Sequence, residues 1–236
     1  MDCQPRALDV MGSSPIVPTL NLHTFIEIGQ INYIAQLTVS IYLAHLNPLT
    51  NAHVEIIEEL KNESKVKVLP VIFLRNGKEV NSRSFPFSYE IRKQMLEVVF
   101  GNTITVSPNY TFHAPFCRYL PPLLSPTSWQ LRKQIIEGID EEYFSYTGDK
   151  TEGRMLKMYR LNPKIGKRKT VSASNVKKKL YEAASGKNTN WEKDVPEKVA
   201  EIIKQNWNII EKFSKEEDKT KKVAGMKFPK EGYWSK

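Results

Sequence analysis

A hydroxyl and an imidazole lie three residues apart in YLAHLNPLTNAHVEII, the segment from Tyr42 to Ile57. Apolar, strand-like residues precede them and an amphipathic pattern follows, so Thr50 and His53 fall at the start of a predicted helix. The unpaired N–H groups of a helix start favour an anion, and side chains three apart can converge on it. This pair could therefore hold a phosphoryl group as charge builds on it. The alternative is an ordinary helix cap with an incidental histidine.

Strands and helices alternate along the chain that surrounds this pair. The expected strands are residues 37–45, 66–74, 103–112 and 143–149. The expected helices are residues 51–62, 88–100, 125–139, 174–184 and 196–213, whereas residues 150–171 give no clear pattern. Such alternation predicts an α/β fold, an open parallel sheet with helices on both faces. Ligands of such sheets bind at the C-terminal ends of the strands, where Thr50 and His53 are expected.

Two motifs in this order resemble the signatures of the HIGH-type nucleotidyltransferases. AHLNPLTNAH (44–53) is similar to the first signature, a small-residue turn, an Asn/Asp-Pro and a T/H-x-G-H box after the first strand. VSASNVK (171–177) is similar to the second, I-S-x-T-x-x-R. The Thr-first box resembles phosphopantetheine adenylyltransferases and cytidylyltransferases. The stretch 177–203, with its tryptophan and VP..V, resembles the end of nicotinamide-nucleotide adenylyltransferases. The resemblance covers about residues 38–210 and implies a Rossmann-like fold.

The resemblance also implies a reaction. It would be transfer of a nucleoside monophosphate, first of all AMP from ATP, to a phosphorylated small molecule such as nicotinamide mononucleotide, a step of NAD biosynthesis. Pyrophosphate would leave, and Mg²⁺ would accompany the nucleoside triphosphate. The histidines and cysteines show no metal-ligand spacing, so no metal site of the protein's own is expected. The identity of the acceptor, and ATP against CTP, stay open.

Particular residues inherit roles from the resemblance. Thr50 and His53 would hold the α-phosphate, with His53 the more important donor. Ser172, Ser174 and Lys177 would hold the β- and γ-phosphates at the start of the second helix. The wider set of implied nucleotide-binding residues is Leu43, Ala44, His45, Gly148, Asp149, Ser172 and Ser174. Arg92 and Arg154 are the expected substrate-binding residues, Arg92 by analogy alone. The alternative for His45 is an ordinary packed residue at a strand end, and the alternative for residues 147–150 is a plain turn. The basic residues of 154–160 could simply be solvated.

Several positions depart from the family pattern. Ala44 and Ala52 stand where the first signature has glycines, and Ser174 stands where the second has threonine but keeps the hydroxyl. Lys177 stands in place of arginine, which keeps the charge and loses the bidentate fork.

The charge distribution supports an alternative function. Residues 163–236 hold 19 Lys and Arg against 10 Asp and Glu, whereas residues 1–162 hold 16 of each, so the whole net charge of +9 lies in the C-terminal third. A basic region of this kind would face a polyanion if one is bound, and otherwise it is a solvated helix face of Lys and Glu. The alternative is thus an RNA-binding or tRNA-modifying protein that retains the nucleotide-binding fold.

We expect three parts in the chain: a leader at 1–36, a nucleotidyltransferase domain at 37–213 and a basic flexible tail at 214–236. The leader shows no sustained period, and its GSSPIVPT back-translates to a sequence like the T-arm of a transfer-RNA gene. Our hypothesis is that the leader is not native or is disordered, and that translation begins near Leu37. Two cysteines make no disulfide framework, which favours the cytoplasm. The most apolar run is too short and polar to span a membrane. Homo-oligomerisation stays open.

Overall fold

The structure is a computed structural model. It describes residues 38–120, 124–167, 169, 171–223 and 225–235 of the 236-residue chain. All of these residues belong to one compact unit. The hypothesis about residues 1–36 lies outside the described residues.

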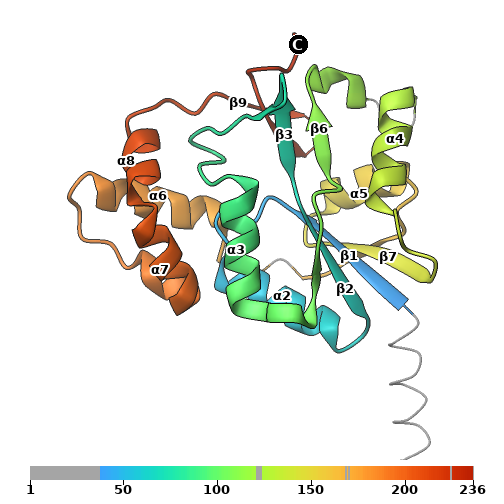
Figure 1. Ribbon diagram of the computed structural model, residues 1–236, viewed down its shortest axis with the longest axis horizontal. Helices are drawn as coiled ribbons and strands as arrows, with labels where there is room; N and C mark the ends of the chain where they lie inside the picture. The colour runs from blue at the N-terminus through green and yellow to red at the C-terminus, as the bar shows by residue number, and fades with distance from the viewer. Residues whose placement is uncertain (1–37, 121–123, 168, 170, 224, 236) are drawn as a thin grey trace, which may run out of the picture. The chain divides into compact units, whose positions relative to one another are not determined.

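A five-stranded sheet forms the centre of this unit (Figure 1). Its strands lie in the order β5-β2-β1-β7-β8, and every neighbouring pair is parallel. The strands are β1 (Thr38–Ala44), β2 (Lys65–Pro70), β5 (Thr105–Val106), β7 (Glu142–Thr147) and β8 (Pro163–Ile165). The chain leaves β1 toward β2 and β5 and later returns to β7 and β8 on the other side. This reversal leaves a crevice outside the C-terminal ends of β1 and β7.

Two hydrophobic cores cover opposite faces of the sheet, which confirms the predicted α/β fold. Side chains alternate along β1: Tyr42 packs into the first core, whereas Ile41 and Leu43 pack into the second. The first core buries residues of α2 (Asn51–Lys61), α3 (Tyr89–Phe100), α6 (Ala173–Ala184), α7 (Glu197–Gln205) and α8 (Trp207–Ser214). The second buries residues of α4 (Pro126–Ile135) and α5 (Lys150–Met158). Short 3₁₀ turns lie at Gly101–Thr103, Phe116–Tyr119 and Trp191–Asp194.

The expected strand 66–74 is two strands in two different sheets. It breaks at Val71, whose N–H donates to the Ala44 carbonyl, so β3 (Ile72–Arg75) leaves the central sheet. Pro70 has no N–H to offer a sheet neighbour, which favours a break here. β3 pairs with β4 (Lys78–Glu79) and with β6 (Thr111–His113). The expected strand 103–112 is likewise divided between β5 and β6.

The expected helix 196–213 is also two helices, α7 and α8, which meet at Asn206. The Asn206 side chain donates to the Ile202 carbonyl at 2.9 Å, a local bond that competes with continued helix. The unassigned stretch 150–171 contains α5 and β8.

The C-terminal segment differs most from expectation, because it is folded where a flexible tail was predicted. β9 (Thr220–Val223) and β10 (Met226–Pro229) form an antiparallel hairpin. Met226, Phe228 and Tyr233 are buried in the second core. Because lysines dominate the sequence of this segment, its few apolar residues form no recognisable pattern. Those few residues are nevertheless sufficient to anchor the segment in the core. None of the helices in the described part of the chain is long and apolar enough to cross a membrane.

Candidate functional site

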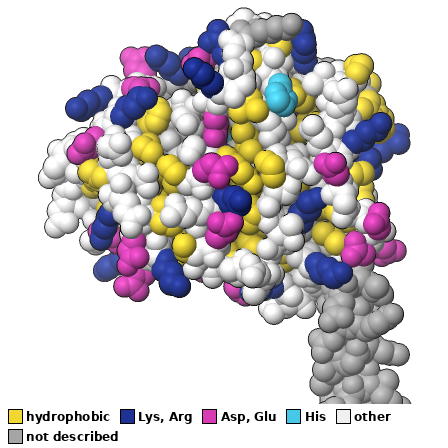
Figure 2. Space-filling model, viewed as in Figure 1, with side chains coloured by type: hydrophobic (Ala, Val, Ile, Leu, Met, Phe, Trp, Pro, Cys, Tyr) yellow, Lys and Arg dark blue, Asp and Glu magenta, His cyan; other side chains and the backbone are white. Residues whose placement is uncertain are grey.

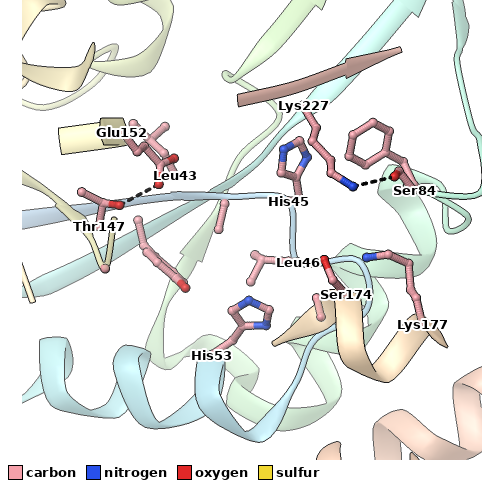
Figure 3. Close-up of a pocket in the computed structure, with 15 residues that line it drawn as sticks. Leu43, His45, Leu46, His53, Ser84, Thr147, Glu152, Ser174, Lys177 and Lys227 are labelled. Atoms are coloured by element: carbon pink, nitrogen blue, oxygen red, sulfur yellow. Dashed lines mark hydrogen bonds between the residues drawn. The ribbon is translucent and has the colours of Figure 1, made fainter. Parts of the chain in front are cut away.

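A cavity of about 270 Å³ lies at the C-terminal ends of β1 and β7 (Figure 3). Its walls come from the end of β1, the starts of α2, α5 and α6, the loop before α3, and β10. The lining residues are Tyr42, Leu43, Ala44, His45, Leu46, His53, Ser84, Phe85, Thr147, Gly148, Glu152, Ala173, Ser174, Lys177 and Lys227.

The turn from β1 to α2 shapes the floor of this cavity. Leu46 is buried and adopts the left-handed conformation, with φ of 47°. Such a conformation is costly for a non-glycine residue and persists where the surroundings hold it. Asn47 provides that hold: its side-chain Nδ2 donates to the Phe87 carbonyl at 2.8 Å, and its Oδ1 accepts from the Phe87 N–H at 3.1 Å. The turn is therefore fastened to the loop before α3.

His53 presents a neutral hydrogen-bond donor at this floor. Its Nδ1 accepts from the Thr50 backbone N–H at 3.1 Å, which assigns the ring proton to Nε2. Burial lowers the pKa of His53 to about 4, and nearby Lys177 adds to the shift. The ring is therefore uncharged at neutral pH, with its Nε2–H left to bond a ligand oxygen.

Lys177 contributes an amino group to the cavity, and no carboxylate of the described residues bonds to it. Its Nζ donates to the Asn47 carbonyl at 2.7 Å. Burial lowers the pKa of Lys177 to about 7, Lys227 lowers it further, and Asp218 opposes the shift. Asp218 therefore offsets the charge of the Lys177 ammonium only in part, and a phosphate would complete this compensation.

The opposite end of the cavity carries Glu152. Thr147 Oγ1 donates to its Oε2 at 2.6 Å (Figure 3). Burial raises the pKa of this carboxyl, and Asp149 adds to the shift. Glu152 is the one carboxylate among the described residues that line the cavity. The site is therefore polarised, with lysines at one end and a hydrogen-bonding carboxyl at the other.

His45 lies between these two ends, and its ring stacks on Phe85 with a centroid separation of 4.6 Å and an interplanar angle of 21°. Burial lowers its pKa to about 3, and Lys177 adds to the shift. His45 is thus an uncharged flat surface at the cavity wall.

The structure brings together most of the expected nucleotide-binding residues. Those that line the cavity are Leu43, Ala44, His45, His53, Gly148, Ser174 and Lys177. Thr50, Asp149 and Ser172 do not line it; they are the N-cap residues of α2, α5 and α6. Thr50 is fully buried, so in place of the expected contact with phosphate it orients the His53 ring.

The two expected substrate-binding arginines lie elsewhere. Arg92 is buried and bonds to Glu79 and to the backbone carbonyls of His45 and Val71, which makes it a structural residue behind the cavity wall. Its charge and its place on a helix suggested that Arg92 binds a phosphate of the substrate. In the structure, its guanidinium instead donates hydrogen bonds to these protein groups. Arg154 is exposed on α5 and does not line the cavity.

Sequence reasoning missed Glu152, Ser84 and Lys227. A signal for Glu152 was present, because it follows the helix cap Asp149 by three residues directly after a strand. Ser84 lies in a loop and Lys227 among many other lysines, so no local pattern distinguishes them.

Comparisons with known proteins support the fold. No protein-family model and no curated protein matches the sequence. Two solved structures of a bifunctional NMN adenylyltransferase/ADP-ribose pyrophosphatase from Francisella tularensis match, each with a TM-score of 0.53. One is complexed with AMP and a manganese ion and is 14% identical, covering 76% of this chain and 52% of its own. The other is 18% identical, covering 77% of this chain and 51% of its own.

The chain therefore spans about half the length of these two structures. At such identities the likeness concerns the fold alone, and it confirms the Rossmann-like fold that the two motifs implied.

Proposed function

We propose that the protein is a nucleotidyltransferase that transfers AMP from ATP to a phosphorylated small molecule such as nicotinamide mononucleotide and releases pyrophosphate. The observation that carries this proposal is the convergence of His53 and Lys177 on one cavity. The two residues come from motifs more than 100 positions apart, and they meet where an open parallel sheet binds its ligands. One of the Francisella structures that share the fold, the bifunctional NMN adenylyltransferase/ADP-ribose pyrophosphatase, is complexed with AMP, which is in keeping with an adenine nucleotide.

The reaction fits the groups in the cavity. A phosphate oxygen of the acceptor would attack the α-phosphorus of ATP, and the bond from that phosphorus to the bridging oxygen of pyrophosphate would break. His53 Nε2–H would donate to a non-bridging α-phosphate oxygen, and Lys177 would hold the departing pyrophosphate. Such a transfer needs positioning and charge neutralisation and no covalent intermediate.

The donor set also bears on Mg²⁺. This ion is commonly held by one or two carboxylates together with substrate phosphates and water. The described residues contain no cluster of three or more side chains suited to a metal. Of the cavity residues, Glu152 alone offers a carboxylate, and it is already bonded to Thr147. The ion is therefore expected to arrive bound to the phosphates of ATP, where it would neutralise part of their charge.

The test is pyrophosphate release by the full chain with Mg²⁺, supplied with ATP or CTP against a panel of phosphorylated acceptors that includes nicotinamide mononucleotide. We expect release that requires one acceptor and one nucleotide and that is lost in the His53→Ala variant. Tight ATP binding without turnover on any acceptor would contradict the proposal.

Affinity for ATP is expected to fall as the pH rises from 6 to 9. Because the pKa of Lys177 is lowered to about 7, the ammonium loses its proton within this range, and binding a phosphate then requires uptake of a proton. A charge-assisted hydrogen bond contributes about 1.5–3 kcal/mol, so the loss should reach about 10- to 100-fold. Isothermal titration calorimetry of ATP at each pH measures it.

The matched control for this prediction is Lys177→Arg, since a guanidinium stays protonated throughout the range. ATP itself ionises further as the pH rises, and this contribution is common to both proteins. A pH dependence that is identical in the two proteins would show that Lys177 does not bind the nucleotide.

The second candidate function is RNA binding, favoured by the net charge of +9 in residues 163–236. The surface gives this candidate less support. On the face shown in Figure 2, Lys and Arg side chains are interspersed with Asp and Glu side chains and form no broad basic surface. Filter binding of RNA at increasing salt distinguishes the two functions, because electrostatic binding weakens steeply with salt. Binding that persists at moderate salt and needs the C-terminal lysines would favour RNA.

A further inference from the structure

The C-terminal hairpin brings a second lysine into the cavity. Lys227, on β10, lines the cavity together with Lys177 on α6 (Figure 3). Its Nζ donates to Ser84 Oγ at 3.2 Å, and Ser84 Oγ in turn donates to Asp218 Oδ2 at 3.0 Å. The same carboxylate oxygen lies 3.6 Å from Lys227 Nζ. Ser84 and Asp218 therefore orient the ammonium at the mouth of the cavity.

The position of Lys227 is fixed by the core beneath it. Its neighbours along the strand, Met226 and Phe228, are 6% and 1% exposed, so the strand cannot turn without exposing them. The segment between α8 and β9 is fixed as well, because Arg83 Nη1 donates to the carbonyls of Phe213 at 2.9 Å and Glu216 at 3.1 Å. Lys227 is thus held in place, unlike an ordinary surface lysine.

A smaller cavity of about 220 Å³ continues the first one past these lysines. Four residues line both cavities: Ser84, Ser174, Lys177 and Lys227. The smaller cavity adds three basic or hydroxyl-bearing side chains and one carboxylate, namely Arg83, Lys178, Tyr181 and Asp218. The combined groove therefore becomes more basic in the direction away from Glu152.

Two ammoniums from separate elements are thus placed on one groove, and together they carry more charge than Asp218 offsets. Lys177 bonds to a carbonyl, and the charge of Lys227 lowers its pKa, so each lysine lies within the field of the other. Such a pair is stabilised by an extended anion with several oxygens, which a polyphosphate provides and a single carboxylate does not.

We propose that Lys227 and Lys177 together bind the terminal phosphates of a polyphosphate, which is the pyrophosphate portion of a nucleoside triphosphate. The identity of this ligand rests on the proposed function. Lys177 would contact it from the start of α6 and Lys227 from the hairpin, while Ser84 and Asp218 position Lys227. Residues 214–236, which the sequence predicts to be a basic flexible tail, would then contribute to the binding site.

The test compares Lys227→Ala with Lys222→Ala in the full chain. Lys222 pairs with Lys227 across the hairpin, is exposed and does not line the cavity, so its replacement removes the same charge from the same hairpin. The probes are inorganic pyrophosphate, ATP and AMP, titrated calorimetrically with Mg²⁺ and without acceptor. For Lys227→Ala we expect affinity for pyrophosphate and ATP to fall about 10- to 100-fold, with AMP affinity unchanged. Lys222→Ala should change none of the three.

Unchanged pyrophosphate affinity in Lys227→Ala would overturn the inference. Equal losses in the two variants, or an equal loss for AMP, would also overturn it, because they indicate a general charge effect. A second variant, Lys227→Gln, keeps most of the packing of the side chain if the alanine variant does not fold, and its melting temperature should match that of the parent.

The inference and the proposed function can fail separately. Pyrophosphate binding that depends on Lys227, with no nucleotidyl transfer to any acceptor, would sustain the first and remove the second. Nucleotidyl transfer that requires His53 and does not change on replacement of Lys227 would sustain the proposed function and remove the inference about Lys227.

Discussion

Replacing His53 with alanine is expected to lower kcat for pyrophosphate release by about 100- to 1,000-fold, with a much smaller change in KM for ATP. The charge on the α-phosphate oxygens grows in the transition state, so a donor placed there contributes mainly to kcat. The His53 ring meets this requirement because its Nδ1 is occupied by the Thr50 N–H and its Nε2 carries the proton. Steady-state kinetics with the acceptor identified by the panel measure the effect.

Two variants separate this role from others. His113→Ala removes an exposed histidine that does not line the cavity, and its rate should equal that of the parent. His53→Gln offers an amide oxygen to the Thr50 N–H and an amide N–H to the ligand, so it should recover part of the rate. A His53→Ala protein that is folded and keeps its rate within about threefold would show that the imidazole is not the donor that this class of transition state requires.

The sequence predicted the position of several residues that line the cavity because two short motifs each open a helix. Alternating strands and helices build a parallel sheet, and the C-terminal ends of its strands share one edge. For that reason His53 and Lys177, far apart along the chain, could be expected in one cavity, where the structure places them. The same reasoning anticipated the strand end at Thr147 and Gly148.

Ser84 and Lys227 reach the site through tertiary packing that leaves no local pattern in the sequence. Lys227 reaches the cavity because Met226 and Phe228 anchor a hairpin whose sequence reads as a charged tail. Arg92 is the opposite error, a residue that the sequence placed in the site and the structure places outside it. A charged residue on a helix suggests a side chain that binds phosphate. Whether such a side chain is exposed or buried depends on a partner in another element, here Glu79.

Replacing Arg92 with alanine is expected to destabilise the protein by about 3–5 kcal/mol, because the change leaves Glu79 partly buried without its partner. The Arg92 side chain is 2% exposed and that of Glu79 is 19% exposed, with 2.9 Å between Nη2 and Oε1. The guanidinium also donates to the carbonyls of His45 at 2.9 Å and Val71 at 2.8 Å. One side chain thus joins the turn after β1, the break after β2, and α3. Urea denaturation followed by circular dichroism measures the loss.

The neighbouring Lys93→Ala is the control, since the Lys93 side chain is 39% exposed and its 3.7 Å ion pair with Glu97 should contribute about 0–1 kcal/mol. Arg92→Lys decides between the two roles considered for this position. A lysine keeps the charge and cannot bond two carbonyls and a carboxylate in the same fork, so a structural Arg92 predicts a substantial loss of stability. An acceptor-phosphate ligand predicts instead a higher KM for the acceptor and an unchanged urea midpoint. Because the guanidinium is enclosed and bonds to three backbone carbonyls and one carboxylate of its own chain, we expect the loss of stability.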